Sequence, residues 1–360
     1  MGAVEEGPGP INVADYERLA SEVLDPGAHG YFAGGAGDER TLRENVAAFA
    51  RWRLRPRALV DVAEVDTRTT VLGEPVAMPI LVAPVAFQRL AHPDGEAGMA
   101  RAAADAGTVM CVSTLATARL GEVAAAAPDA RLWFQLYCFR DRGVTRALLS
   151  EAVEAGFRAV ALTVDAPRPG RRERDLRSGF QVPAEVGVPS VAEVAGVQGA
   201  ISVADVLRLV DPALSWADLE ALVSDSSLPV LVKGVMTAED AVLAAERGAA
   251  GVIVSNHGGR QLDGVAATID AVGEVAEAVG DRVEVLMDGG VRRGTDVVTA
   301  LALGARAVLV GRPAVWGLAV AGTDGARAVL GLLRDELELA LALCGCPAPE
   351  SVSRAHVQRA

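Results

Sequence analysis

The stretch PVLVKGVMTAEDAVLAAERGAAGVIVSNHG (229–258) consists of two apolar runs joined by one amphipathic segment. The runs PVLVKGV (229–235) and GVIVSNHG (251–258) are rich in Val, Ile and Leu, as expected of parallel strands that are buried on both faces. Between them, AEDAVLAAERGA (238–249) is rich in Ala, Leu and Glu and ends near a glycine, which is typical of a helix. The stretch therefore predicts a strand, a helix and a second, parallel strand.

The same unit recurs along the chain from residue 78 onward. The eight apolar runs are 78–87, 108–114, 131–138, 159–166, 229–235, 251–258, 282–290 and 307–313. Helix-like segments such as 95–107 and 143–156 separate them. Eight βα units predict an α/β protein built on a closed (β/α)8 TIM barrel. An open doubly wound sheet is the alternative, but no G-x-G-x-x-G motif follows the first strand.

Two regions lie outside this repeat. Residues 1–77 predict an N-terminal helical cap over the base of the barrel, with helices at 13–23 and 40–50 and a β-like piece at 67–72. Residues 167–228 form a long segment, rich in Pro, Gly and Arg at its start, after the fourth strand. Loops of this length are uncommon unless they are functional, so we expect an active-site lid. The predicted boundaries of the single domain are 1–360 in total, 78–343 for the barrel and 344–360 for a C-terminal tail.

Composition excludes several classes of function. The net charge of -13 argues against a partner that is a nucleic acid, because phosphate binding needs clustered Lys and Arg. No charge-free apolar stretch of about 20 residues predicts a membrane span, and the acidic start MGAVEEGPGP is unlike a signal peptide. The four cysteines (Cys111, Cys138, Cys344 and Cys346) lack the spacing of a zinc site, so we expect no metal and a reducing, cytoplasmic location.

Polar residues and glycines follow nearly every predicted strand. In barrel enzymes the C-terminal ends of the strands meet at the active site, so these residues are candidates for chemistry. They are Pro84, Val85, Ala86, Ser113, Gln135, Tyr137, Thr163, Asp165, Lys233, Ser255, His257, Asp288, Gly289, Gly290, Gly311 and Arg312.

The last two strand ends suggest a phosphate site. Gly289, Gly290 and Gly311 permit a close approach of the backbone, and Arg292 and Arg312 offer charge-assisted hydrogen bonds. Glycines also serve ordinary turns, so this motif alone leaves both readings open.

His257 is the best candidate for a general base, because imidazole titrates near neutral pH. Arg260, three residues later, could hold a carboxylate, and Asp165 could bond the second ring nitrogen. A structural histidine and an Asp165 that caps a helix are the alternatives. Lys233 is the only lysine among 34 basic residues, which suggests a role that a guanidinium group cannot fill.

These motifs resemble the FMN-dependent L-2-hydroxy acid oxidases and dehydrogenases, a family that includes glycolate oxidase, lactate oxidase and mandelate dehydrogenase. The resemblance extends from about residue 12 to residue 343. The segments that carry it are SNHGGRQLDG (255–264), VAPVAFQRLAHPDGE (82–96), WFQLY (133–137), LTVDAPRPGRRERD (162–175), LVKGV (231–235) and DGGVRRGTDV (288–297).

The resemblance implies FMN as the cofactor and a role for each candidate. It implies that the flavin and ribityl chain contact Pro84, Val85, Ala86, Ser113, Gln135, Thr163, Lys233 and Ser255. It places the phosphate at Asp288, Gly289, Gly290, Arg292, Gly311 and Arg312. It assigns the substrate carboxylate to Arg172, Arg260 and Tyr31, the 2-hydroxyl to Tyr137, and the base to His257 with Asp165 as its partner.

The reaction implied is the oxidation of an L-2-hydroxy acid to a 2-oxo acid. The small Ala86 is compatible with O2 as the acceptor, giving H2O2, and the family implies a homotetramer. A dehydrogenase that uses another acceptor, a non-redox barrel such as an isomerase, and a non-catalytic ligand-binding barrel are the alternatives.

Leu115 bears on the substrate, since plant-type glycolate oxidases have Trp at the corresponding place. The smaller side chain predicts a larger pocket and a substrate larger than glycolate, such as a mandelate-like or longer aliphatic acid. Pro169 also replaces an aliphatic residue that is common in the lid. The alternative is that a side chain of the lid fills the space.

Overall fold

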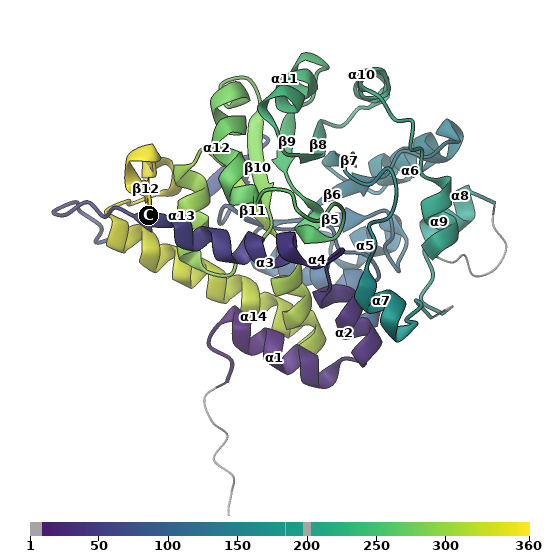
Figure 1. The fold of residues 1–360 in the computed structure, drawn as a ribbon, viewed down its shortest axis with the longest axis horizontal. Helices are drawn as coiled ribbons and strands as arrows, with labels where there is room; N and C mark the ends of the chain where they lie inside the picture. The colour runs from purple at the N-terminus through teal and green to yellow at the C-terminus, as the bar shows by residue number, and fades with distance from the viewer. Residues whose placement is uncertain (1–8, 184, 197–202) are drawn as a thin grey trace, which may run out of the picture.

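The computed structural model describes residues 9–183, 185–196 and 203–360. A closed barrel of eight parallel strands lies at its centre, and the strands follow one another around it in chain order (Figure 1). The strands are β4 (Ile80–Val82), β5 (Val109–Ser113), β6 (Arg131–Leu136), β7 (Ala159–Thr163), β8 (Val230–Val235), β9 (Gly251–Val254), β10 (Glu284–Asp288) and β11 (Ala307–Val310). The predicted (β/α)8 barrel is confirmed.

The strands are shorter than the apolar runs that predicted them, and they have two different faces. Alternate side chains point into the barrel, where they form one apolar cluster that includes Cys111, Trp133, Ala161, Leu231, Ile253 and Leu286. The residues two positions further along each strand or just past its end share this inward direction. They are Ser113, Gln135, Thr163, Lys233, Ser255 and Asp288. The period of two therefore places a polar ring on top of an apolar barrel core.

Helices surround the barrel. The ring consists of α4 (Gly95–Asp105), α5 (Leu120–Ala126), α6 (Arg142–Glu154), α10 (Trp216–Asp225), α11 (Ala238–Glu246), α12 (Thr268–Val279), α13 (Gly294–Ala302) and α14 (Arg312–Cys344). The predicted lid needs one correction, because α10 packs beside α11 and buries Leu219, so the end of 167–228 belongs to this ring. The rest of that segment carries α7 (Glu173–Ser178), α8 (Pro189–Val194) and α9 (Val203–Leu209); residues 184 and 197–202 lie outside the described residues.

The N-terminal segment covers both ends of the barrel. Its elements are α1 (Val13–Val23), α2 (Pro26–Ala33), α3 (Arg40–Ala47), the 3-10 helix η1 (Ala48–Arg51), β1 (Trp52–Leu54), β2 (Thr69–Val71) and β3 (Glu74–Val76). The β2–β3 hairpin closes the base, where the backbone N–H of Leu72 donates to Glu284 at the start of β10 (2.8 Å). The expectation of a cap at the base is wrong for α2 and α3, which lie at the opposite end, against α7 and the loop after β9.

The rest of the N-terminal and C-terminal segments packs on the outside. Helix α1 lies along α14 (Figure 1). After α14 come two 3-10 helices, η4 (Pro349–Ser351) and η5 (Arg354–His356), and then β12 (Val357–Arg359), which pairs antiparallel with β1. The predicted tail 344–360 is thus tied to the N-terminal segment. The start of the predicted cap, residues 1–8, lies outside the described residues.

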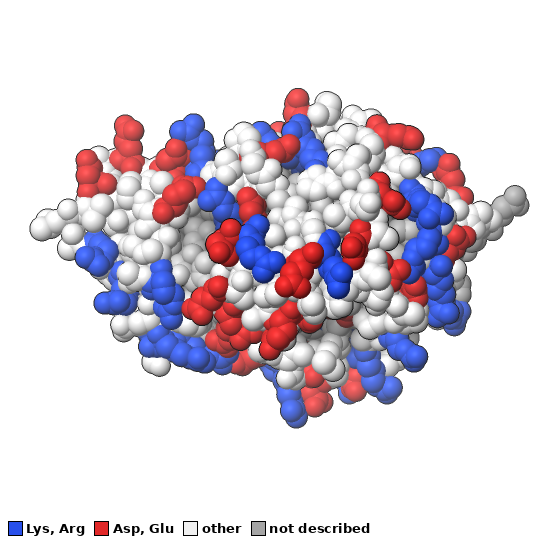
Figure 2. Space-filling view, turned by 90° about the horizontal axis from the view of Figure 1, so that it is seen from above, with Lys and Arg blue, Asp and Glu red and all other residues white. Residues whose placement is uncertain are grey.

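Acidic and basic side chains are interspersed on the face seen in Figure 2, without a wide field of one sign. In the described part of the chain, no helix has the length and apolar character needed to cross a membrane. All four cysteines are buried and free.

Candidate active site

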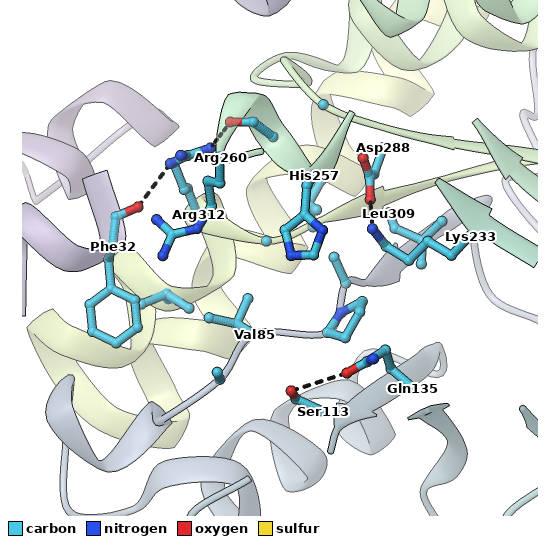
Figure 3. A pocket seen from close by; sticks show the side chains of 18 of the residues that line it. Phe32, Val85, Ser113, Gln135, Lys233, His257, Arg260, Asp288, Leu309 and Arg312 are labelled. Atoms are coloured by element: carbon cyan, nitrogen blue, oxygen red, sulfur yellow. Dashed lines mark hydrogen bonds and ion pairs between the residues drawn. The ribbon is translucent and has the colours of Figure 1, made fainter. Parts of the chain in front are cut away.

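A cavity opens at the C-terminal ends of the barrel strands, above the polar ring (Figure 3). It holds about 1110 Å³ of space outside protein atoms, its mouth included. All the residues predicted for the site line the cavity except Asp165 and Ser255, which bond to residues that do.

His257 and Asp165 form a hydrogen-bonded pair. Nδ1 of His257 lies 2.9 Å from Oδ1 of Asp165. Burial would raise the pKa of Asp165, but the charge and hydrogen bond of His257, together with Lys233, hold it below its ordinary value. A carboxylate at Nδ1 favours the tautomer that carries its proton there, which leaves Nε2 free to accept one.

The backbone of His257 is strained. Its φ is +58°, in the left-handed region that side chains with a Cβ atom rarely adopt. The Ser255 hydroxyl accepts from the His257 N–H (3.1 Å). A Cβ atom on Gly258 would lie 2.8 Å from a guanidinium nitrogen of Arg312. The orientation of the imidazole is therefore set by a tightly packed loop and not by a strand.

Lys233 is buried at the centre of the polar ring. Its Nζ lies 3.0 Å from Oδ2 of Asp288 and 2.8 Å from the Ser255 hydroxyl. Burial alone would lower the pKa of Lys233, but the carboxylates of Asp288 and Asp165 raise it above its ordinary value. The only lysine of the chain is thus a fixed positive charge in the floor of the cavity.

Two arginines stand over the ring of Tyr31. The guanidinium carbon of Arg260 lies 4.8 Å and that of Arg172 lies 5.7 Å from the ring centroid. Burial and the charge of Arg172 lower the pKa of Arg260 to about 10. Among the described residues, neither arginine forms an ion pair with a carboxylate. Two close cations without a counter-ion fit a bound anion.

Tyr137 also lines the cavity. Burial and the negative charge of Asp165 raise its pKa to about 12. Its phenol therefore stays protonated at neutral pH and can donate a hydrogen bond.

A second pair of arginines, Arg292 and Arg312, also lines the cavity, and Arg312 lies beside Arg260, since both donate to the carbonyl of Gly34. Arg312 donates to the backbone carbonyls of Phe32 (2.9 Å), Gly258 (3.0 Å) and Gly34 (2.8 Å), as Figure 3 shows for the first. Burial lowers the pKa of Arg292 and, together with the charges of Arg260 and Arg292, lowers that of Arg312. Gly289 and Gly290 beside them have φ of +97° and +82°. Arg292, Arg312, Gly289 and Gly290, which we call the anion site, therefore offer charge and backbone N–H groups to an anion.

Four buried polar atoms of the cavity lining have no hydrogen-bond partner within the described part of the chain. They are Nε2 of Gln135, Oγ1 of Thr163, Nε of Arg172 and Oδ1 of Asp288. The other end of the Gln135 amide is fixed, since its Oε1 accepts from the Ser113 hydroxyl (3.2 Å) and the Thr114 N–H (3.1 Å). An unpaired buried polar group is costly, so these atoms fit a ligand with a polar edge.

The predicted site residues include Tyr31 of α2 but not its neighbour Phe32, and none of them lies on α9, which contributes Leu207 to the lining. A signal for α2 was present, because Asp25 accepts from the N–H groups of Gly27 and Ala28 and Pro26 begins the helix. Only the family resemblance, through Tyr31, indicated that α2 reaches the cavity, and no pattern in the sequence indicated this for α9.

The chain is similar to known proteins over nearly its whole length. The family described as FMN-dependent dehydrogenase matches residues 20–359. Glycolate oxidase 3 of Arabidopsis thaliana is 50% identical over 352 residues (96% of this chain and 95% of the relative), and L-lactate oxidase of Nostoc sp. is 49% identical over 347 residues (94% and 95%). The solved structure of mandelate oxidase with (S)-4-hydroxymandelic acid has a TM-score of 0.92 at 42% identity and covers 97% of this chain and 99% of its own. The chain belongs to the FMN-dependent dehydrogenase family.

Proposed function

We propose that this protein oxidises an L-2-hydroxy acid to the 2-oxo acid with FMN as its cofactor and O2 as the acceptor, giving H2O2. One observation carries the proposal: His257, which is paired with Asp165, lines the same cavity as Arg172 and Arg260, and neither arginine pairs with a carboxylate among the described residues. A base beside a site for an anion suits a substrate with a carboxylate and an acidic neighbouring group.

The residues of the cavity fit FMN. Arg292, Arg312 and the backbone of Gly289, Gly290 and Gly311 would hold its phosphate. The unpaired Nε2 of Gln135 and Oγ1 of Thr163 would bond to the flavin and ribityl groups, beside Lys233, Pro84, Val85, Ala86 and Ser113. When bound, FMN accepts two electrons from the substrate and passes them to the acceptor.

A second set of side chains in the cavity would bind and orient the substrate. Arg172 and Arg260 would hold its carboxylate above Tyr31, and the protonated Tyr137 would donate to its 2-hydroxyl. Nε2 of His257 would take the proton that leaves the substrate, and the Asp165 carboxylate would stabilise the imidazolium that forms.

Two features favour O2 and a substrate larger than glycolate. The small Ala86 lines the cavity, and the curated relatives carry the names of oxidases. Leu115, buried in the same lining, leaves space that an indole would fill, and the mandelate oxidase structures hold aromatic acids such as (S)-mandelic acid.

The deciding experiment is anaerobic. The visible spectrum of the purified protein is recorded before and after addition of L-mandelate, L-lactate or glycolate. We expect a yellow flavin band that L-mandelate bleaches and air restores. Bleaching without rapid recovery in air would identify a dehydrogenase, and a yellow protein that no hydroxy acid bleaches would point to a non-redox or non-catalytic barrel.

We also propose a homotetramer in the cytoplasm. Exposed Leu59, Leu339 and Leu343 provide apolar surface that subunits could cover, and four free, buried thiols suit a reducing compartment. Light scattering on the purified protein and fractionation of the source cells test the two statements.

A further inference from the structure

Asn45 of α3 and Asn256, the residue before His257, form a reciprocal amide pair. Nδ2 of Asn45 donates to Oδ1 of Asn256 (2.8 Å), and Nδ2 of Asn256 donates to Oδ1 of Asn45 (2.8 Å). Both side chains are buried, with 2% and 5% of their surface exposed. Since 211 residues separate them, the pair fixes the N-terminal segment to the barrel.

The same pair holds the loop of His257. Oδ1 of Asn256 also accepts from the Gly259 N–H (3.1 Å), and Nδ2 also donates to the carbonyl of Ala266 (3.0 Å). His257, with its left-handed φ, lies between Asn256 and Gly259, and the hydrogen bond between these two residues spans it. A strained residue of this kind keeps its conformation only where its surroundings enforce it.

Asn45 also contacts Gly289 and Gly290 of the anion site. A Cβ atom on Gly290 would lie 1.9 Å from the backbone oxygen of Asn45, and one on Gly289 would lie 3.4 Å from its Nδ2. Oδ1 of Asn45 accepts from the N–H of Thr268 (3.4 Å), whose hydroxyl donates to the carbonyl of Gly289 (3.4 Å). Asn45 thus contacts both the loop of His257 and the loop of Gly289 and Gly290.

We infer that Asn45 is a positioning residue for this reaction: it sets the His257 loop and the Gly289–Gly290 loop relative to each other. The inference rests on the proposed function, since it assigns the base to one loop and the FMN phosphate to the other. Asn45 touches neither ligand itself, because the cavity is lined by its neighbours and not by its side chain.

The test uses Asn45→Asp, which keeps the volume of the side chain but cannot donate to Asn256, and Asn45→Ala as the second variant. The exposed neighbour on the same helix, Val46→Ala, is the matched control. Three quantities are measured: the Kd for FMN by flavin fluorescence, kcat and KM of the FMN-saturated enzyme, and Tm.

We expect both Asn45 variants to raise the Kd for FMN and to lower kcat, each by at least tenfold, with KM for the hydroxy acid within about threefold of wild type. Val46→Ala should match wild type. A lower Tm with the Kd and kcat within twofold of wild type would show a purely structural role. A change in only the Kd or only kcat would show that Asn45 serves a single loop. Either result overturns the inference.

The failure of the proposed function is a separate outcome. If no hydroxy acid reduces the wild-type protein, the proposed function fails, and an unchanged Kd for FMN in the variants would separately overturn the positioning role.

Discussion

Nδ1 of His257 lies 2.9 Å from Oδ1 of Asp165, although 92 residues separate them in the chain. Asp165 follows β7 and His257 follows β9, with β8 between them in the barrel. The closure of the sheet therefore brings the proposed base and its partner together at the C-terminal ends of the strands, where the cavity lies.

The first prediction concerns His257→Gln. We expect this variant to keep its yellow FMN and to lose turnover by about 10²–10⁴-fold, the usual contribution of a general base. The reason is that Nε2 of His257 would act on the substrate and would not hold the flavin. Steady-state kinetics of the FMN-loaded variant test this, with His92→Gln, outside the cavity, as the control. Wild-type turnover in His257→Gln would remove His257 from the mechanism.

The second prediction is a pH dependence of stability. The pKa of Asp165 lies below its ordinary value of 3.8 in the folded protein, so the folded state favours the carboxylate. This stabilisation is present above about pH 4 and is lost as the pH falls through the lowered pKa. The difference in Tm between wild type and Asp165→Asn should be largest near neutral pH and should shrink below about pH 4. A difference that stays constant from pH 3 to pH 7 would contradict the lowered pKa.

The third prediction concerns the buried ion pair of Lys233 and Asp288. Lys233→Met leaves the Asp288 carboxylate without its cation and should cost about 3–5 kcal/mol of unfolding free energy. The double variant Lys233→Met/Asp288→Asn should recover part of this loss, because no buried charge remains unpaired. Urea unfolding of the apoproteins measures both. Additive losses in the double variant would show that the two charges do not interact.

The fourth prediction concerns the anion site. Arg292→Gln should raise the Kd for FMN roughly 10–150-fold, the equivalent of one hydrogen bond to a charged group. Riboflavin, which lacks the phosphate, should bind wild type and variant equally. The neighbouring Arg293, which is exposed and pairs with Glu336, gives the control Arg293→Gln. An equal loss of riboflavin affinity would place the phosphate elsewhere.

The fifth prediction concerns substrate size. Leu115→Trp should fill the space beside Leu115 and lower kcat/KM for L-mandelate relative to glycolate by roughly 10–100-fold. Leu115→Met, of similar volume, should leave the ratio unchanged. Parallel kinetics with the two acids test this. A ratio unaffected by the indole would show that Leu115 does not border the substrate side chain.

The sequence predicted the barrel and most of the cavity because both follow from local patterns. The period of two along β6 places Trp133 and Gln135 on the same inner face, and the same rule applies to Leu231 and Lys233 on β8. The roles of these residues toward FMN and the substrate remain predictions. The location of α2 and α3 could not be read from periodicity, which indicates that a helix has a buried face but not what buries it.

The sequence by itself determined the eight βα units, the polar ring above the barrel core and the motif around His257, because each depends on residues that are neighbours in the chain. Only the tertiary structure decided that the carbonyls of Phe32 and Gly34 bind Arg312 and that Asn45 pairs with Asn256. These contacts join residues more than 200 positions apart. They arise from the close approach that glycines such as Gly259 and Gly290 permit, where a Cβ atom would collide with the backbone of α3.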